Sequence, residues 1–205
     1  MSQDVANSVR GKFRVLAIND NYLLAPWCDI HYHCDMKWWD WALSGRHPAQ
    51  QRFGPPDKMA AFFRDLKCLR VTLDNSVKAR EDVPHVKVLG NASYQRPKKL
   101  GTLSSDPRYI CTGGNSGFQC LNIAYHLEPK RVLLLGYTMQ ATNDRDVHWF
   151  GQHPVRTSPS IFLKTFVKHF DTAAPLLRRK GIEVINCTPD SALQCFPYVP
   201  LERFL

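Results

Sequence analysis

The sequence predicts an α/β domain on a mostly parallel sheet, because short apolar strands alternate with amphipathic helices along the chain. The strand candidates are 13–18, 29–35, 69–73, 86–89, 109–111, 131–135 and 182–185. The helix candidates are 36–43, 57–66, 118–127 and 160–179, where apolar residues recur at helical spacing. Such alternation favours a single Rossmann-like domain with helices on both faces of the sheet.

Turn and cap residues set the boundaries of these elements. The first strand ends at the polar triplet 19–21, and two prolines at 55–56 precede the second helix. The first helix closes at Ser-Gly 44–45, and Gly181 caps the last one. Thr-Pro at 188–189 predicts a further short helix, with threonine as N-cap and proline at the first helical position.

Length and composition predict one domain over residues 1–205, with residues 1–12 left open as a disordered segment. The chain is 44% hydrophobic and 22% charged, and it shows no low-complexity tract or linker. It lacks a signal peptide and any run of about 20 apolar residues, so we expect a cytoplasmic protein with no membrane partner. The seven cysteines, an odd number, are expected to be buried reduced thiols.

The net charge of +9 favours anionic partners, because lysine and arginine interact with phosphates. Nucleic acid is one such partner, although no RNA-recognition motif or zinc-finger spacing is present. A solvated basic surface or a nucleotide ligand explains the charge equally well.

Polar residues follow the carboxyl ends of the predicted strands, where open parallel sheets bind ligands. The predicted ligand-binding residues are Asn19, Asp20, Asn21, Asp35, Gly113, Gly114, Asn115, Ser116, Tyr137, His153, Asn186 and Thr188. They belong to five loops, which we expect to converge on one crevice.

The turn Gly113-Gly114-Asn115-Ser116-Gly117 opens the helix at 118–127 and permits two interpretations. Its glycines and the amides of the helix N-terminus could hold a phosphate or carboxylate. Alternatively, the glycines serve only the backbone conformation of a turn and cap. The turn is neither a Gly-x-Gly-x-x-Gly nor a Walker A sequence.

The segment 137–159 is longer than ordinary connections, and such loops are usually functional or disordered. It holds His148 beside Trp149 and Phe150, and His153 five residues further on. A histidine titrates near neutrality, so His148 is a candidate general base. The alternative for both histidines is a structural packing role.

Four residues of types that bind metals alternate on the second strand, at Asp29, His31, His33 and Asp35. Strand-spaced side chains seldom chelate a metal without ligands from elsewhere, so the sequence predicts no metal site here. The tryptophans at 27, 38, 39 and 41 are interpreted as packing around a helix, although an exposed pair could stack on a base or sugar ring.

Six segments together resemble a family of small proteins common in tailed phages and prophages. They are Ile18-Asn19-Asp20-Asn21-Tyr22 with Ala25-Pro26-Trp27, Cys34-Asp35-x-Lys37-Trp38-Trp39, Gly114-Asn115-Ser116-Gly117 with Leu121-Asn122-x-Ala124, Leu134-Leu135-Gly136-Tyr137-x-Met139, His148-Trp149-Phe150-Gly151-x-His153-Pro154 and Asn186-Cys187-Thr188-Pro189-x-Ser191-Ala192-Leu193.

More distantly, the segment 114–139 resembles bacterial sialyltransferase-like glycosyltransferases and pterin pyrophosphokinase-like proteins. Thr138 stands where those families carry an aspartate. The resemblance implies a phage-encoded, metal-independent transferase that needs no cofactor and uses a nucleotide sugar as donor. Asn19, Asn21, Gly114 and Ser116 would hold the nucleotide, and His148 would deprotonate the acceptor, for which nucleic acid is one candidate.

Two further hypotheses remain open. The first is a non-catalytic protein that binds a nucleotide or a host protein. The second is a Mg²⁺-dependent phosphoryl or pyrophosphoryl transferase, whose carboxylate ligands would come from Asp20, Asp35, Asp144 and Asp146.

Overall fold

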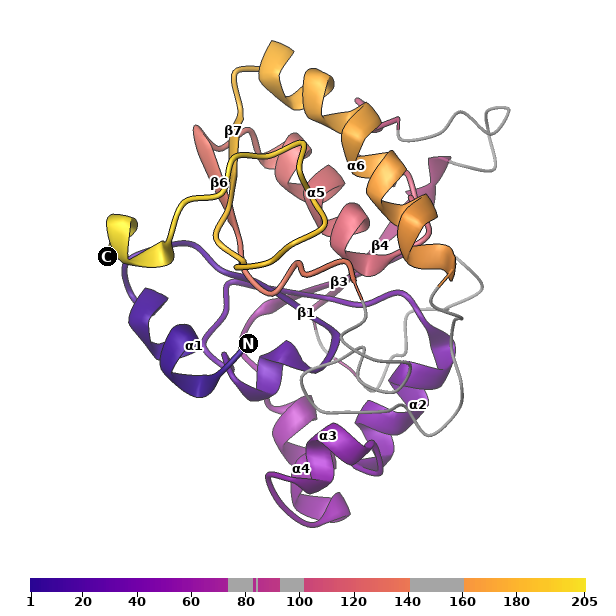
Figure 1. Cartoon of the computed structure of the whole chain (residues 1–205). Coiled ribbons are helices and arrows are strands. Elements are labelled where there is room, and N and C mark those ends of the chain that lie inside the picture. Colours follow the sequence, from indigo (N-terminus) through magenta and orange to yellow (C-terminus); the bar gives the residue numbers. More distant parts are fainter. Residues whose placement is uncertain (74–82, 84, 93–101, 141–160) are drawn as a thin grey trace. The chain divides into compact units, whose positions relative to one another are not determined.

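The structure is a computed structural model that describes residues 1–73, 83, 85–92, 102–140 and 161–205 (Figure 1). The chain divides into two compact units. Unit 1 comprises Met1, Asn91–Val147 and Ser158–Leu205, and unit 2 comprises Ser2–Gly90 and His148–Thr157. The predicted single domain over 1–205 therefore stays a prediction, and each unit has its own core.

Unit 2 carries four parallel strands and the helices between them. Its elements are α1 (Gln3–Val9), β1 (Leu16–Ile18), η1 (Asn19–Leu23), β2 (Ile30–Tyr32), α2 (Met36–Ser44), α3 (Pro48–Gln51), α4 (Pro56–Arg64), β3 (Leu69–Leu73) and β4 (Val86–Asn91). Each of the first three strands pairs in parallel with the next. Within unit 2 the sheet order is β1-β2-β3-β4. This confirms the predicted α/β class and Rossmann-like sheet.

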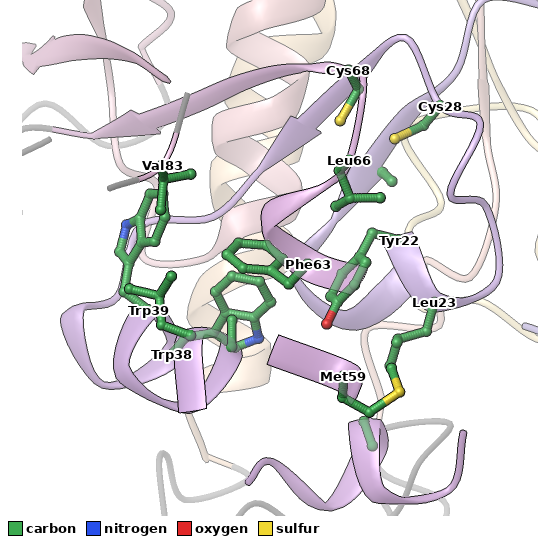
Figure 2. Close-up of a cluster of buried hydrophobic side chains, with 14 residues drawn as sticks. Tyr22, Leu23, Cys28, Trp38, Trp39, Met59, Phe63, Leu66, Cys68 and Val83 are labelled. Carbon is green, nitrogen blue, oxygen red and sulfur yellow. The ribbon is translucent and has the colours of Figure 1, made fainter. Parts of the chain in front are cut away.

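An aromatic cluster forms the core of unit 2, as Figure 2 shows. Trp38 and Trp39 of α2 are almost fully buried and pack edge-on against Phe63 of α4, with ring centroids 5.5 and 5.9 Å apart. The predicted packing role of these two tryptophans is confirmed. The thiols of Cys28 and Cys68 point toward each other at one side of the cluster (Figure 2).

Unit 1 holds the second half of the chain. Its elements are β5 (Tyr109–Ile110), α5 (Ser116–Leu127), β6 (Arg131–Leu134), α6 (Ile161–Arg179), β7 (Glu183–Asn186) and η3 (Leu201–Phe204). β6 and β7 pair in parallel from Arg131 and Glu183 onward. Phe118 of α5 and Phe170 of α6 are fully buried and meet edge-to-face at 5.4 Å, which joins the two helices.

The structure corrects one predicted helix and adds two α-helices. No helix starts at Thr188-Pro189, because Asp190 adopts a left-handed backbone with φ of 53° and the segment turns instead. The first twelve residues, left open as disordered, contain α1, whose N-cap Ser2 accepts a hydrogen bond from the Val5 amide. The four-residue α3 was not predicted.

The seven cysteines are free, and five of them are buried, as the sequence predicted. Within the described residues, none of the helices combines the length and apolar character needed to cross a bilayer.

Candidate functional site

The predicted ligand-binding residues are distributed over both units. Unit 1 carries Gly113, Gly114, Asn115, Ser116, Tyr137, Asn186 and Thr188, and unit 2 carries Asn19, Asp20, Asn21 and Asp35. His148 and His153 lie outside the described residues. The predicted crevice of five loops draws on both units and stays a prediction.

In unit 1, the loops after β6 and β7 are joined by hydrogen bonds. The Tyr137 amide donates to the Thr188 hydroxyl oxygen at 2.9 Å, and that hydroxyl lies 3.4 Å from the Leu134 carbonyl oxygen. The Thr188 amide in turn donates to the Asn186 side-chain oxygen at 3.0 Å. Three of the predicted residues therefore lie together at the carboxyl ends of two adjacent parallel strands.

The Tyr137 side chain connects this pair of loops to the first turn of α5. Its hydroxyl donates to the Gly117 carbonyl oxygen at 3.1 Å. A Cβ atom at Gly117 would lie 2.8 Å from the tyrosine ring, so the glycine permits this close approach. Burial raises the pKa of Tyr137 well above 10, so the hydroxyl stays protonated and remains a donor.

The turn at 113–117 is stabilised by packing and by a side-chain cap. Gly113 and Gly114 have left-handed backbones, with φ of 51° and 75°. A Cβ at Gly113 would lie 2.1 Å from the Phe118 ring. The Asn115 side-chain oxygen accepts from the Phe118 amide at 2.8 Å, which makes Asn115 the N-cap of α5. Packing and capping thus account for Gly113 and Asn115.

A further residue, Asn122 of α5, anchors the chain that leads into this turn, although no role was predicted for it from the sequence. Its side-chain oxygen accepts from the amides of Ser104 and Cys111, both at 2.9 Å. Its side-chain nitrogen donates to the Ser104 carbonyl oxygen at 3.1 Å. Because Cys111 directly follows β5, Asn122 fixes the start of the turn against the helix. An asparagine on the inner face of an apolar helix is the signal that could have identified it.

In unit 2, the predicted triplet after β1 forms the start of η1. Asn19 adopts a left-handed backbone with φ of 49°, and its carbonyl oxygen lies 2.8 Å from His31 Nε2. Asp20 is 1% exposed, accepts from the Trp38 indole N–H at 3.1 Å and lies 3.2 Å from His47 Nδ1. The Asp20 carboxylate is therefore enclosed by protein groups.

Asp35 differs from Asp20 because it is exposed. It occupies the N-cap position of α2, without a side-chain hydrogen bond to the helix. Asp29 forms an ion pair with Arg14 at 2.8 Å. The described residues contain no group of three histidine, cysteine or acidic side chains that could hold a metal ion.

A polar face of the unit 2 sheet was also missed as a candidate site. His31 and His33 of the β2 region and Arg70 and Thr72 of β3 are all fully buried. Burial lowers the pKa of His31 to about 4 and that of His33 well below 6.5, so both rings are neutral at pH 7. The alternation of 29, 31, 33 and 35 was noticed in the sequence, but only as a metal motif.

Comparison with protein-family models, curated proteins and solved structures found no match to this chain.

Proposed function

We propose that unit 1 binds the phosphate groups of a nucleotide at the first turn of α5, and that the protein transfers a group from a nucleotide-activated donor without a metal. The donor we favour is a nucleotide sugar. The observation that supports this proposal is the junction described above. Tyr137 links the ends of β6 and β7 to the first turn of α5.

The physical basis is the electrostatics of a helix N-terminus next to the carboxyl ends of parallel strands. Amides in the first turn of a helix lack intrahelical acceptors, and the helix dipole places partial positive charge there. α5 has 12 residues and begins at Ser116, which is partly exposed. Gly114, two residues before the helix, is exposed. A phosphate can approach this turn, and the chain's net charge of +9 favours such an anion.

Replacing Ser116 by aspartate should affect phosphate binding and helix stability in opposite directions. A carboxylate at the first helical position interacts favourably with the dipole, so Ser116→Asp should keep or raise the melting temperature. The same charge repels phosphate, and nucleotide affinity should fall about tenfold or more, since 1.4 kcal/mol corresponds to a factor of ten. Calorimetric titration with nucleotides and nucleotide sugars measures the affinity.

The matched control is Ser116→Asn, which is similar in size to the aspartate variant but neutral. It should bind nucleotides with nearly the affinity of the wild type. Equal nucleotide affinity in the aspartate and asparagine variants would place any phosphate elsewhere on the protein.

Catalysis is tested through His148, the proposed general base for the acceptor hydroxyl. His148→Ala should keep donor binding and lower turnover of the donor about 10²–10⁴-fold, the usual contribution of a general base. Product formation across a panel of nucleotide sugars, followed by mass spectrometry, gives the readout.

His153→Ala is the matched control, because it removes another histidine from the same predicted loop, 137–159. Unchanged turnover in His148→Ala would show that His148 is not the general base. Saturable nucleotide binding with no product in the wild type would favour the non-catalytic binder. Loss of turnover on adding a chelator would favour the Mg²⁺-dependent phosphoryl transferase.

A further inference from the structure

Buried polar atoms without a hydrogen-bond partner gather in unit 2. Among the described residues, they include Asn21 Oδ1, His31 Nδ1, both ring nitrogens of His33, Trp39 Nε1 and Thr72 Oγ1. All of these atoms belong to η1, α2 and the β2–β3 region. Folded proteins leave few buried polar groups unpaired, and such a concentration points to a missing partner.

The cluster lies toward the carboxyl end of the unit 2 sheet. His31 pairs in register with Arg70, and Tyr32 pairs with Val71. Continuing this register by one residue brings His33, directly after β2, opposite Thr72, one residue before the end of β3. Open parallel sheets bind ligands at this end of their strands.

The hydrogen-bonding roles of the cluster can be assigned from its contacts. The Asn19 carbonyl oxygen can only accept, so His31 Nε2 carries the proton of the neutral ring and His31 Nδ1 is an acceptor. Asn21 Oδ1 is also an acceptor. A neutral His33 offers one donor and one acceptor, and the Thr72 hydroxyl offers both.

We infer that the cluster around His33 and Thr72 binds neutral hydroxyl groups, supplied by internal water or by a sugar. Hydroxyl groups both donate and accept, as this set of atoms requires. A fully ionised phosphate group only accepts hydrogen bonds and would leave His31 Nδ1 and Asn21 Oδ1 unpaired. A metal cation is disfavoured by the Arg70 guanidinium, whose positive charge adds to the larger effect of burial in lowering the pKa of both histidines.

Aromatic rings surround these polar atoms. The His33 ring contacts two indoles, with its centroid 4.3 Å from the Trp38 ring centroid and 4.1 Å from that of Trp39. Water and sugar hydroxyls both suit a polar patch of this kind, because water bridges buried polar atoms and sugar rings pack on aromatic faces. The inference concerns unit 2 alone and stands if nucleotide binding in unit 1 fails.

The test is the sign of the stability change in Thr72→Val, measured by thermal unfolding without nucleotide. If a bound hydroxyl pairs with Thr72, the valine removes that pairing and the melting temperature falls by about 2–4 °C, the shift expected for about one hydrogen bond. If Thr72 has no partner, the valine removes an unpaired buried polar group and the melting temperature rises, which overturns the inference.

Thr72→Ser is the matched variant, because it keeps the hydroxyl group. Its melting temperature is expected to be higher than that of Thr72→Val. Free neutral monosaccharides distinguish the two sources of the hydroxyl. A saturable stabilisation of the wild type that Thr72→Val loses identifies a sugar site. A lowered melting temperature in Thr72→Val with no sugar effect identifies internal water. Stabilisation by inorganic phosphate that Thr72→Val loses would contradict the neutral ligand.

Discussion

Acidification from pH 7 to pH 4.5 is expected to lower the free energy of unfolding by about 2–3 kcal/mol through His31 alone. Burial lowers the pKa of His31 in the folded protein to about 4, from 6.5. Between these two values the unfolded chain binds a proton that the folded protein does not. The contribution of His31 to the free energy of unfolding is therefore fully present above pH 6.5, and it is lost as the pH falls toward 4. His33, with a pKa lowered well below 6.5, adds to the loss.

Denaturant unfolding at a series of pH values measures this dependence, and His31→Gln is its matched control. Glutamine can still donate to the Asn19 carbonyl oxygen but does not titrate in this range. Its stability should depend less steeply on pH than that of the wild type. The same slope in both proteins would show that His31 does not carry the effect.

Gly113→Ala is expected to destabilise the protein by about 3 kcal/mol and to lower the melting temperature by about 6–12 °C. Two costs add up at this position. The backbone is left-handed with φ of 51°, which a Cβ atom disfavours. The new Cβ also falls 2.1 Å from the ring of Phe118, which is fully buried between α5 and α6.

Gly181→Ala separates the two costs. Gly181 also has a left-handed backbone, with φ of 76°, but its added Cβ would meet nothing within 4 Å. This variant should lose only about 1 kcal/mol, the conformational part of the penalty. Thermal unfolding of both variants gives the comparison. Equal losses in the two would mean that Phe118 adjusts to a side chain at 113 without cost.

Much of the fold could be predicted, because the apolar runs and helical spacings are strong local signals. The predicted strand 69–73 coincides with β3, and the helix predicted at 36–43 is α2 with one more residue. Gly45 ends α2 in a left-handed conformation, as the Ser-Gly signal indicated. The error at Thr188 has a nonlocal cause. Its hydroxyl pairs with the Tyr137 amide, 51 residues away, instead of capping a helix.

The candidate sites could be predicted less completely, because burial and pairing depend on contacts distant in sequence. Polar residues after strands correctly marked the loops at Tyr137 and Thr188, which meet in unit 1. Nothing local distinguishes Thr72 from an ordinary strand threonine, and the apolar helix face around Asn122 does not show which groups its side chain bonds. The first lies on a buried sheet face, and the second bonds to a segment 18 residues earlier.

The order of the strands in unit 2 bears on how the chain folds. β1, β2, β3 and β4 lie side by side in the order in which they occur in the sequence. Each pairing therefore closes a short stretch of chain, and the entropic cost of loop closure is small. Contacts between nearby segments form fastest, so we expect this sheet to assemble early, while the rest of the chain is still emerging from the ribosome.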